Sequence, residues 1–299
     1  MRKRLLYAFA VLTFGLLAAC SNAGSGGTDA GHEDAHHEGD GGHGDQGDHG
    51  DQGDHGDHGG HGEQGAEAGM VGLTAAFSFP NGAPAAKEET ELAIAFRDES
   101  GGAVTEFEIT HEKLLHLIVV SHDLSFFNHI HPDAREDGTF HINTSFPTGG
   151  EYKLFADVKP KGGAGVTLSE WVKVEGAEGK HEAIAPDAAF VKEASGKEIE
   201  LAADRWKANE DVTLTFVVRD ARTKEGIADL EPYLGAVGHV VILSADAERY
   251  LHVHPIDERS TGPEAAFATS FPEPGIYKIW GQFQHQGEVI TVSYVVEVE

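Results

Sequence analysis

One arrangement of three histidines is present twice in this chain. Each copy has a first His, a second His 13 positions later and a third His two positions after that, followed by Pro. The two sets are His116, His129 and His131, and His239, His252 and His254. Neutral imidazole is a common metal ligand, and three imidazoles with one open coordination position suit Zn(II) or Cu(II). The pattern therefore predicts a duplicated metal-binding unit with one three-His site in each repeat.

The spacing within each copy allows the three rings to converge. Alternate residues of a strand share a face, so His129 and His131 point the same way. His116 begins the apolar run 117–120, and a turn near residues 122–125 would return the next strand against it. Pairing of His116 with either later histidine puts all three rings on one face, because directly opposed Cβ atoms lie about 5 Å apart. The second copy keeps the spacing and is expected to share this geometry.

The sequence leaves the identity of the fourth ligand of each predicted site undecided. The candidates are His141 and Asp157 in the first copy and His285 in the second. Asp157 aligns with Gln282, and this position also suits a hydrogen bond to a ring N–H from outside the ligand set. Histidines without a counterpart in the other repeat are expected on the surface, and these are His111, His122 and His181.

Sulfur ligands and catalytic groups are scarce in the sequence. Cys20 is the only cysteine, and the two methionines are Met1 and Met70. A blue-copper centre needs a Cys ligand, so that class is excluded, and a Met-rich Cu(I) site is not expected. We find no carboxylate repeated beside the histidines as a general base and no nucleophile motif. The chain is therefore expected not to be an enzyme.

The N-terminus predicts export and anchoring. Residues 1–4 carry positive charge, and the apolar stretch Leu5–Ala19 has 15 residues, which suits a signal peptide better than a membrane span. It ends in Leu-Ala-Ala-Cys20, which resembles the bacterial lipobox. By that resemblance, residues 1–20 are a lipoprotein signal peptide, and Cys20 carries lipid. The mature chain is then extracytoplasmic and anchored to the cell membrane.

Residues 21–69 form a segment of low complexity rich in Gly, Asp, His, Glu and Gln, without Lys or Arg. Such a segment has too little apolar surface to fold, so we expect disorder. Its eight histidines are His32, His36, His37, His43, His49, His55, His58 and His61. Two interpretations stay open: a solvated tether, or a tether that also collects divalent cations weakly at imidazole and carboxylate groups. The formal net charge of the whole chain, -28, argues against nucleic acid as a partner.

From residue 70 the sequence predicts an all-β fold. Apolar and alternating runs of 5–8 residues are separated by Gly, Pro, Asp and Asn. The region also aligns with itself, which sets two repeats at 70–176 and 187–299 with a polar linker between them. About seven short strands per repeat predict two tandem immunoglobulin- or cupredoxin-like β-sandwiches. The aromatic residues expected in the two sandwich cores are Tyr152, Phe155, Tyr277 and Trp280.

The repeated unit resembles exported bacterial domains of the YtkA/FixH-like, cupredoxin-related kind. The resemblance rests on the strand that starts at His116, on the two His-x-His-Pro motifs, and on the motifs that start at Thr144, Gly150 and Gly275. It covers residues 70–299 and implies handling of copper or another metal. The chain lacks the Cys and axial Met of true cupredoxins, so electron transfer is not implied.

These features predict a lipid-anchored, extracytoplasmic metal-binding protein. Its function would be to buffer Zn or Cu, to deliver the metal, or to confer resistance to it. Its partners would be the membrane through Cys20, divalent metal ions, and a protein that donates or accepts the metal. The alternative is an envelope interaction or adhesion module on a flexible tether, in which metal has no function.

Overall fold

The structure is a computed structural model that describes residues 72–299 except residue 252. The predicted signal peptide, Cys20 and the eight histidines of the low-complexity segment lie outside the described residues, as do His252 and the side chain of His254. Within the described part, every regular element is a β-strand, and no helix is long and apolar enough to span a membrane. Both repeats belong to one compact unit.

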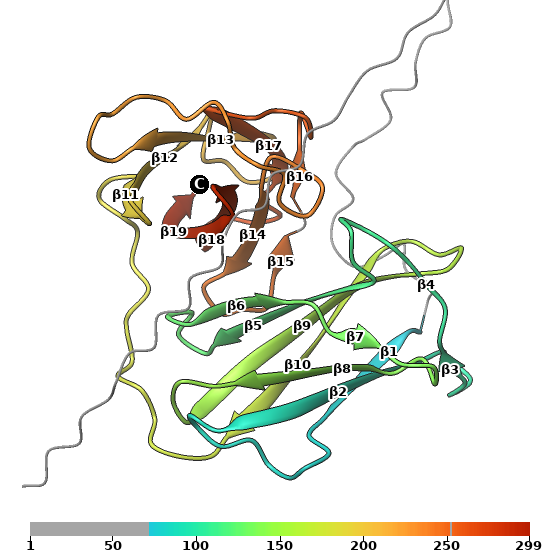
Figure 1. Cartoon of the computed structure of the whole chain (residues 1–299). Helices are drawn as coiled ribbons and strands as arrows, with labels where there is room; N and C mark the ends of the chain where they lie inside the picture. Colours follow the sequence, from blue (N-terminus) through green and yellow to red (C-terminus); the bar gives the residue numbers. More distant parts are fainter. Residues whose placement is uncertain (1–71, 252) are drawn as a thin grey trace, which may run out of the picture. The chain divides into compact units, whose positions relative to one another are not determined.

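The first repeat is a sandwich of two antiparallel sheets (Figure 1). One sheet has the order β1-β2-β8-β7, with β3 beside β2; the other has the order β10-β9-β5-β6, with β4 beside β9. The strands are β1 (Thr74–Ser78), β2 (Glu89–Arg97), β3 (Ala103–Val104), β4 (Phe107–Glu108), β5 (Leu115–Ser121), β6 (Phe127–Ile130), β7 (Asp133–Ala134), β8 (Phe140–Ser145), β9 (Gly150–Pro160) and β10 (Val166–Val174).

The second repeat is also a sandwich of two antiparallel sheets, with the orders β11-β12-β13-β17-β16 and β15-β14-β18-β19. The strands are β11 (Val191–Ala194), β12 (Lys197–Ala203), β13 (Asp211–Asp220), β14 (His239–Ser244), β15 (Tyr250–Leu251), β16 (His254–Pro255), β17 (Glu264–Ser270), β18 (Gly275–His285) and β19 (Glu288–Val298). The prediction of two tandem β-sandwiches is confirmed.

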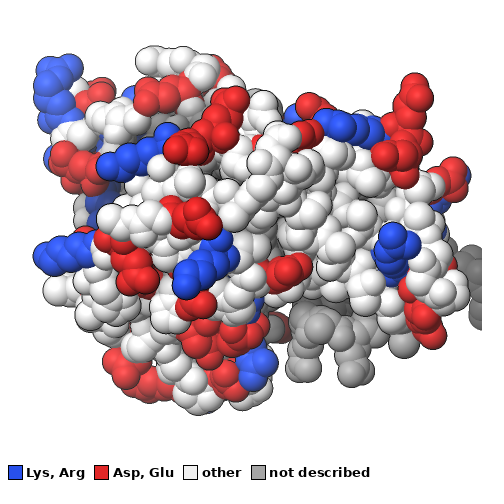
Figure 2. Space-filling view, turned by 90° about the horizontal axis from the view of Figure 1, so that it is seen from below, with Lys and Arg blue, Asp and Glu red and all other residues white. Residues whose placement is uncertain are grey.

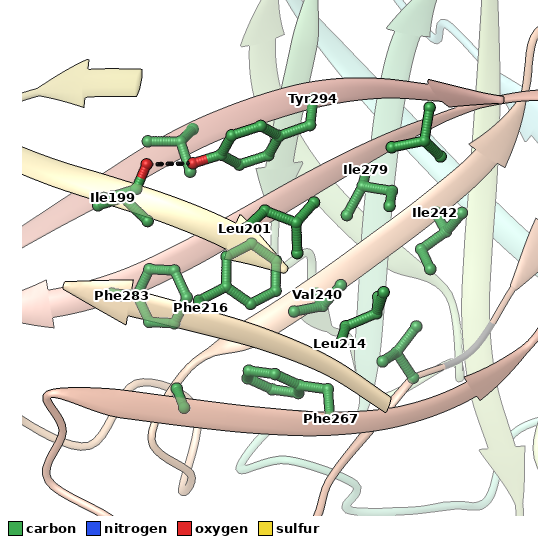
Figure 3. Close-up of a cluster of buried hydrophobic side chains, with 14 of the residues drawn as sticks. Ile199, Leu201, Leu214, Phe216, Val240, Ile242, Phe267, Ile279, Phe283 and Tyr294 are labelled. Carbon is green, nitrogen blue, oxygen red and sulfur yellow. Dashed lines mark hydrogen bonds between the residues drawn. The ribbon is translucent and has the colours of Figure 1, made fainter. Parts of the chain in front are cut away.

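Alternation of side chains builds each core. In β13 every second residue is buried, including Leu214 and Phe216, while the residues between them are partly exposed. Figure 3 shows these two side chains packed with Phe267 of the neighbouring strand β17 and with Ile279 and Phe283 of β18 in the opposite sheet. One face of β13 therefore belongs to the core, and the opposite face borders solvent.

Buried tyrosines satisfy their hydroxyl groups with backbone carbonyls. Tyr294 donates to the oxygen of Ile199 at 2.7 Å inside the second core (Figure 3). Tyr152 and Tyr277, which occupy equivalent positions in β9 and β18, each donate to a carbonyl four residues upstream, at 2.9 Å and 2.8 Å. This is the geometry of the tyrosine corner of immunoglobulin-like sandwiches.

Candidate functional site

Two strands are buried on both faces, and they join the repeats. In β5, Leu117 and Val119 point into the first core, while Ile118 and Val120 contact the second repeat. The equivalent strand β14 does the same from the other side. The apolar cluster that the two repeats share is called the junction here, and it consists of Ile118, Val120, Leu124, Phe155, Val241, Leu243, Ala247 and Trp280. Phe155 and Trp280 thus lie between the repeats rather than in their own cores, so that part of the sequence prediction was wrong.

Equivalent residues exchange partners across the junction. Phe127 stacks on Trp280 with ring centroids 4.8 Å apart, and the matching pair, Tyr250 and Phe155, has centroids 5.4 Å apart. Polar contacts border this apolar area. Lys278 donates to the carbonyl oxygen of Leu124 at 2.8 Å. The apolar and polar contacts together fix how the sheet containing β5 faces the sheet containing β14.

The first three-His set assembles at one end of the junction. Leu117 pairs with Ile130 in the β5–β6 ladder, a register that places His116 opposite position 131 and on the same face as His129. One ring nitrogen from each of His116, His129 and His131 lies within 4.8 Å of the other two. The first two rings are buried and the third is half-buried. The predicted convergence of these rings is present in the structure.

Hydrogen bonds set the proton positions on two of the rings. His116 Nε2 donates to the carbonyl oxygen of Thr110 at 2.9 Å, because a carbonyl can only accept. His129 Nδ1 donates to Oε1 of Gln282 at 2.7 Å, and the Nε2 of this amide donates to Thr291 Oγ1 at 3.1 Å. A neutral imidazole carries one N–H. When both rings are neutral, His116 Nδ1 and His129 Nε2, which lie 3.1 Å apart, therefore face each other with lone pairs.

Burial lowers the pKa of two rings of the set. It lowers the pKa of His129 to about 3, although the hydrogen bond to Gln282 acts in the opposite direction. Burial also lowers the pKa of His131 to about 4, with a smaller contribution from the charge of His116. His131 Nε2 is itself buried and has no hydrogen-bond partner among the described atoms. The neutral rings of His129 and His131 thus lie in one small space with the ring of His116, an arrangement that a cation would satisfy.

Two further histidines lie beside this set. The ring of His239, from the second repeat, stacks on His116 with centroids 5.6 Å apart and lies 4.8 Å from the ring of His129. The ring of His111 lies 5.6 Å from that of His239. His111 was expected on the surface, but its ring also lies 6.1 Å from that of His116 in its own repeat. The sequence gives no signal of its contact with His239, because only the packing of the two repeats creates that contact.

The remaining candidates are distributed as follows. His141 lies on β8 in the opposite sheet, where Nδ1 contacts Glu91 at 2.8 Å. His285 ends β18, with Nε2 3.2 Å from Asp229 Oδ1. Asp157 pairs with His116 in the β5–β9 register, as Gln282 pairs with His239 in β14–β18. The hydrogen bond expected from this aligned position is therefore made by Gln282, and it reaches His129 of the other repeat.

Charged side chains form no comparable cluster on the face seen in Figure 2. Acidic and basic side chains alternate there, and neither sign gathers into one large patch. Ion pairs on the protein surface include Arg249 with Glu273 and Lys224 with Glu198. The histidine set and the junction are therefore the candidate functional features among the described residues.

Comparisons with known proteins give a family and a group of distant structures. A family model described as Domain of unknown function (DUF8832) matches residues 71–176 and, a second time, residues 192–299. No curated protein matches the sequence. Similar solved structures include the Escherichia coli adhesin FdeC (15% identity, TM-score 0.25), invasin, titled a bacterial integrin-binding protein (15%, 0.23), and the Yersinia pseudotuberculosis adhesin InvE (13%, 0.23).

Each of these three matches covers 75% of this chain. The matched parts make up 64% of FdeC, 39% of invasin and 57% of InvE. At these TM-scores the likeness transfers no partner to this chain. The family model covers both predicted repeats, and its description names no YtkA- or FixH-like family.

The predicted metal buffering, delivery or resistance function with one three-His site per repeat is also corrected. His239 of the second repeat lies against His116 and His129, so the site of one repeat is not separate from that of the other. The similar structures cited are those of two adhesins and of invasin.

Proposed function

The chain belongs to the family of Domain of unknown function (DUF8832), which it contains twice, and we propose that the two copies act together as an interaction module of the bacterial envelope. The observation that carries this proposal is the junction. Each repeat uses the outer face of one sheet to bind the other repeat, which leaves the outer face of its second sheet available for a partner. The proposed role is binding without catalysis.

The free face of the second repeat suits contact with a protein. In the β12–β13–β17 ladder, Thr215 lies between Ala202 and Ala266, and Thr213 pairs with Ala268. These side chains point away from the core and are half-buried or exposed. Small uncharged residues on a regular sheet can be covered without the cost of burying charge. We therefore name this surface, made of Ala202, Thr213, Thr215, Ala266 and Ala268, the contact face.

Crosslinking in living cells tests the contact face. A photoreactive benzoylphenylalanine in place of Thr215 is expected to give one discrete adduct with an envelope protein, which mass spectrometry identifies. The same residue in place of Lys161, an exposed position after β9, serves as the matched control and should not give that adduct. The proposal fails when neither position gives an adduct, or when both give the same set.

Anchoring at Cys20 is the second part of the proposal, supported by the lipobox-like motif that ends there. We expect the unaltered chain to fractionate with membranes and to incorporate labelled fatty acid. The Cys20→Ser variant should lose the label and appear in the soluble extracytoplasmic fraction. Membrane association that persists in this variant without label would contradict lipid anchoring and leave the crosslinking result untouched.

A further inference from the structure

We propose that His116, His129 and His131 bind one divalent transition-metal ion at the junction, with His239 of the second repeat beside it. The ion belongs to the class that imidazole prefers, Zn(II) or Cu(II). Its role would be to hold the two repeats in their observed arrangement. This inference does not depend on the contact face or on a partner.

The first argument is the pair of facing lone pairs. In the neutral form of His116 and His129, the one N–H of each ring donates to Thr110 or Gln282, so no proton remains between the two nitrogens that lie 3.1 Å apart. Two lone pairs at this distance repel each other. A cation between them turns the repulsion into two coordinate bonds.

The second argument is the third ring. His131 Nε2 is buried without a hydrogen-bond partner in the described part of the chain, and a buried polar atom of this kind is costly. It lies in the same group of ligand atoms, all within 4.8 Å of one another. Nitrogen ligands of a tetrahedral Zn(II) ion with bonds of 2.0–2.1 Å lie roughly 3.3 Å apart. A small rotation of the His131 side chain would complete such a set.

The third argument is the set of hydrogen bonds that orient the ligand rings. Metal-binding histidines usually donate their second N–H to a carbonyl or carboxylate, which fixes the ring. His116 does so to Thr110, and His129 does so to Gln282. Gln282 comes from β18 of the second repeat, so one hydrogen bond links a first-repeat ligand to the other sandwich. An ion bound here would be sensitive to the packing of the repeats.

The test uses the full mature chain with its eight histidines between residues 32 and 61 replaced by Asn, so that this segment cannot supply imidazole. Zn(II) and Cu(II) salts are titrated into it by calorimetry, and X-ray absorption counts the imidazoles on the bound ion. We expect tight binding with at least three imidazoles. The His131→Asn variant should bind one ion fewer, and Gln282→Leu should weaken the affinity roughly 10–100-fold.

The control variant is His141→Asn, which removes a histidine of the first repeat from the opposite sheet and should leave binding unchanged. Folding is checked by the melting temperature without metal, which should be nearly equal for His131→Asn and the parent, because this ring nitrogen makes no hydrogen bond. Added metal should raise the melting temperatures of the parent and of His141→Asn, but not that of His131→Asn. The inference is overturned when the parent binds no ion, or when His131→Asn binds as many ions as His141→Asn.

Discussion

Replacing Trp280 by Ala is expected to lower the free energy of unfolding by about 3–5 kcal/mol, the usual cost of removing a large buried aromatic side chain. Trp280 is only 3% exposed, and it stacks on Phe127 of the other repeat. The variant therefore loses packing energy at the junction rather than in either core. We expect one calorimetric unfolding transition in the unaltered chain and two separate transitions in the variant.

Trp206 provides the control of matched residue type. It packs beside Phe190 and Phe271 against the core of the second repeat, away from the junction residues. Trp206→Ala should destabilise the second repeat without splitting the transition. A single transition in Trp280→Ala, with a loss no greater than that of Trp206→Ala, would show that the junction does not couple the repeats.

Asp123→Asn is expected to cost about 2 kcal/mol at neutral pH, within the range for hydrogen bonds to a charged group. Asp123 Oδ1 accepts from the hydroxyl groups of Ser121 and Ser125, both at 2.7 Å, and Oδ2 accepts from the backbone N–H of Glu182 in the linker at 2.9 Å. An Asn amide can keep only one oxygen as an acceptor, so its NH2 group would face the Glu182 N–H. Chemical denaturation measures the loss, and limited proteolysis of the linker should become faster.

The stability difference between the unaltered chain and Asp123→Asn should depend on pH, because the variant lacks the titratable Asp123 carboxylate. Burial raises the pKa of Asp123, but the hydrogen bonds from Glu182, Ser125 and Ser121 outweigh it and hold this pKa below its ordinary value of 3.8. Because the folded pKa is depressed, the stabilisation is present above that ordinary value and is lost as the pH falls below it. The difference between the unaltered chain and Asp123→Asn should therefore shrink below about pH 4.

Asp246 is the matched control, since it occupies the equivalent turn of the second repeat. It accepts from Ser244 Oγ at 2.5 Å and from the backbone N–H of Glu248 at 3.0 Å, and both partners lie in its own turn. Asp246→Asn should thus cost less and leave linker proteolysis unchanged. Equal proteolysis rates in the two variants would contradict the role assigned to Asp123.

The strands and the first histidine set could be predicted from the sequence because both follow from local rules. Alternation in residues such as Val212, Leu214 and Phe216 marks a strand with one buried face, and the spacing of His116, His129 and His131 fixes their common face. These features depend on strand geometry and on one hairpin. Neither requires knowledge of how the repeats pack.

The junction was missed, although the sequence holds a signal for it. The run Leu117–Val120 is apolar without alternation, which indicates a strand buried on both faces. Phe155 similarly lies on the opposite face of β9 from Leu154, so its side chain could not belong to the same core. The position of His111 had no such signal. Its distance to His239 depends on the relative placement of the two repeats, which no local pattern encodes.

The exchange of equivalent partners across the junction is the contact pattern of an isologous dimer, here made within one chain. Two separate copies would dissociate on dilution, whereas a short linker holds the second copy at an effective concentration on the order of millimolar. The association of the sandwiches therefore does not depend on how many molecules a cell makes. Covalent linkage also frees the two halves to diverge, as Asp157 and Gln282 already have at one shared position.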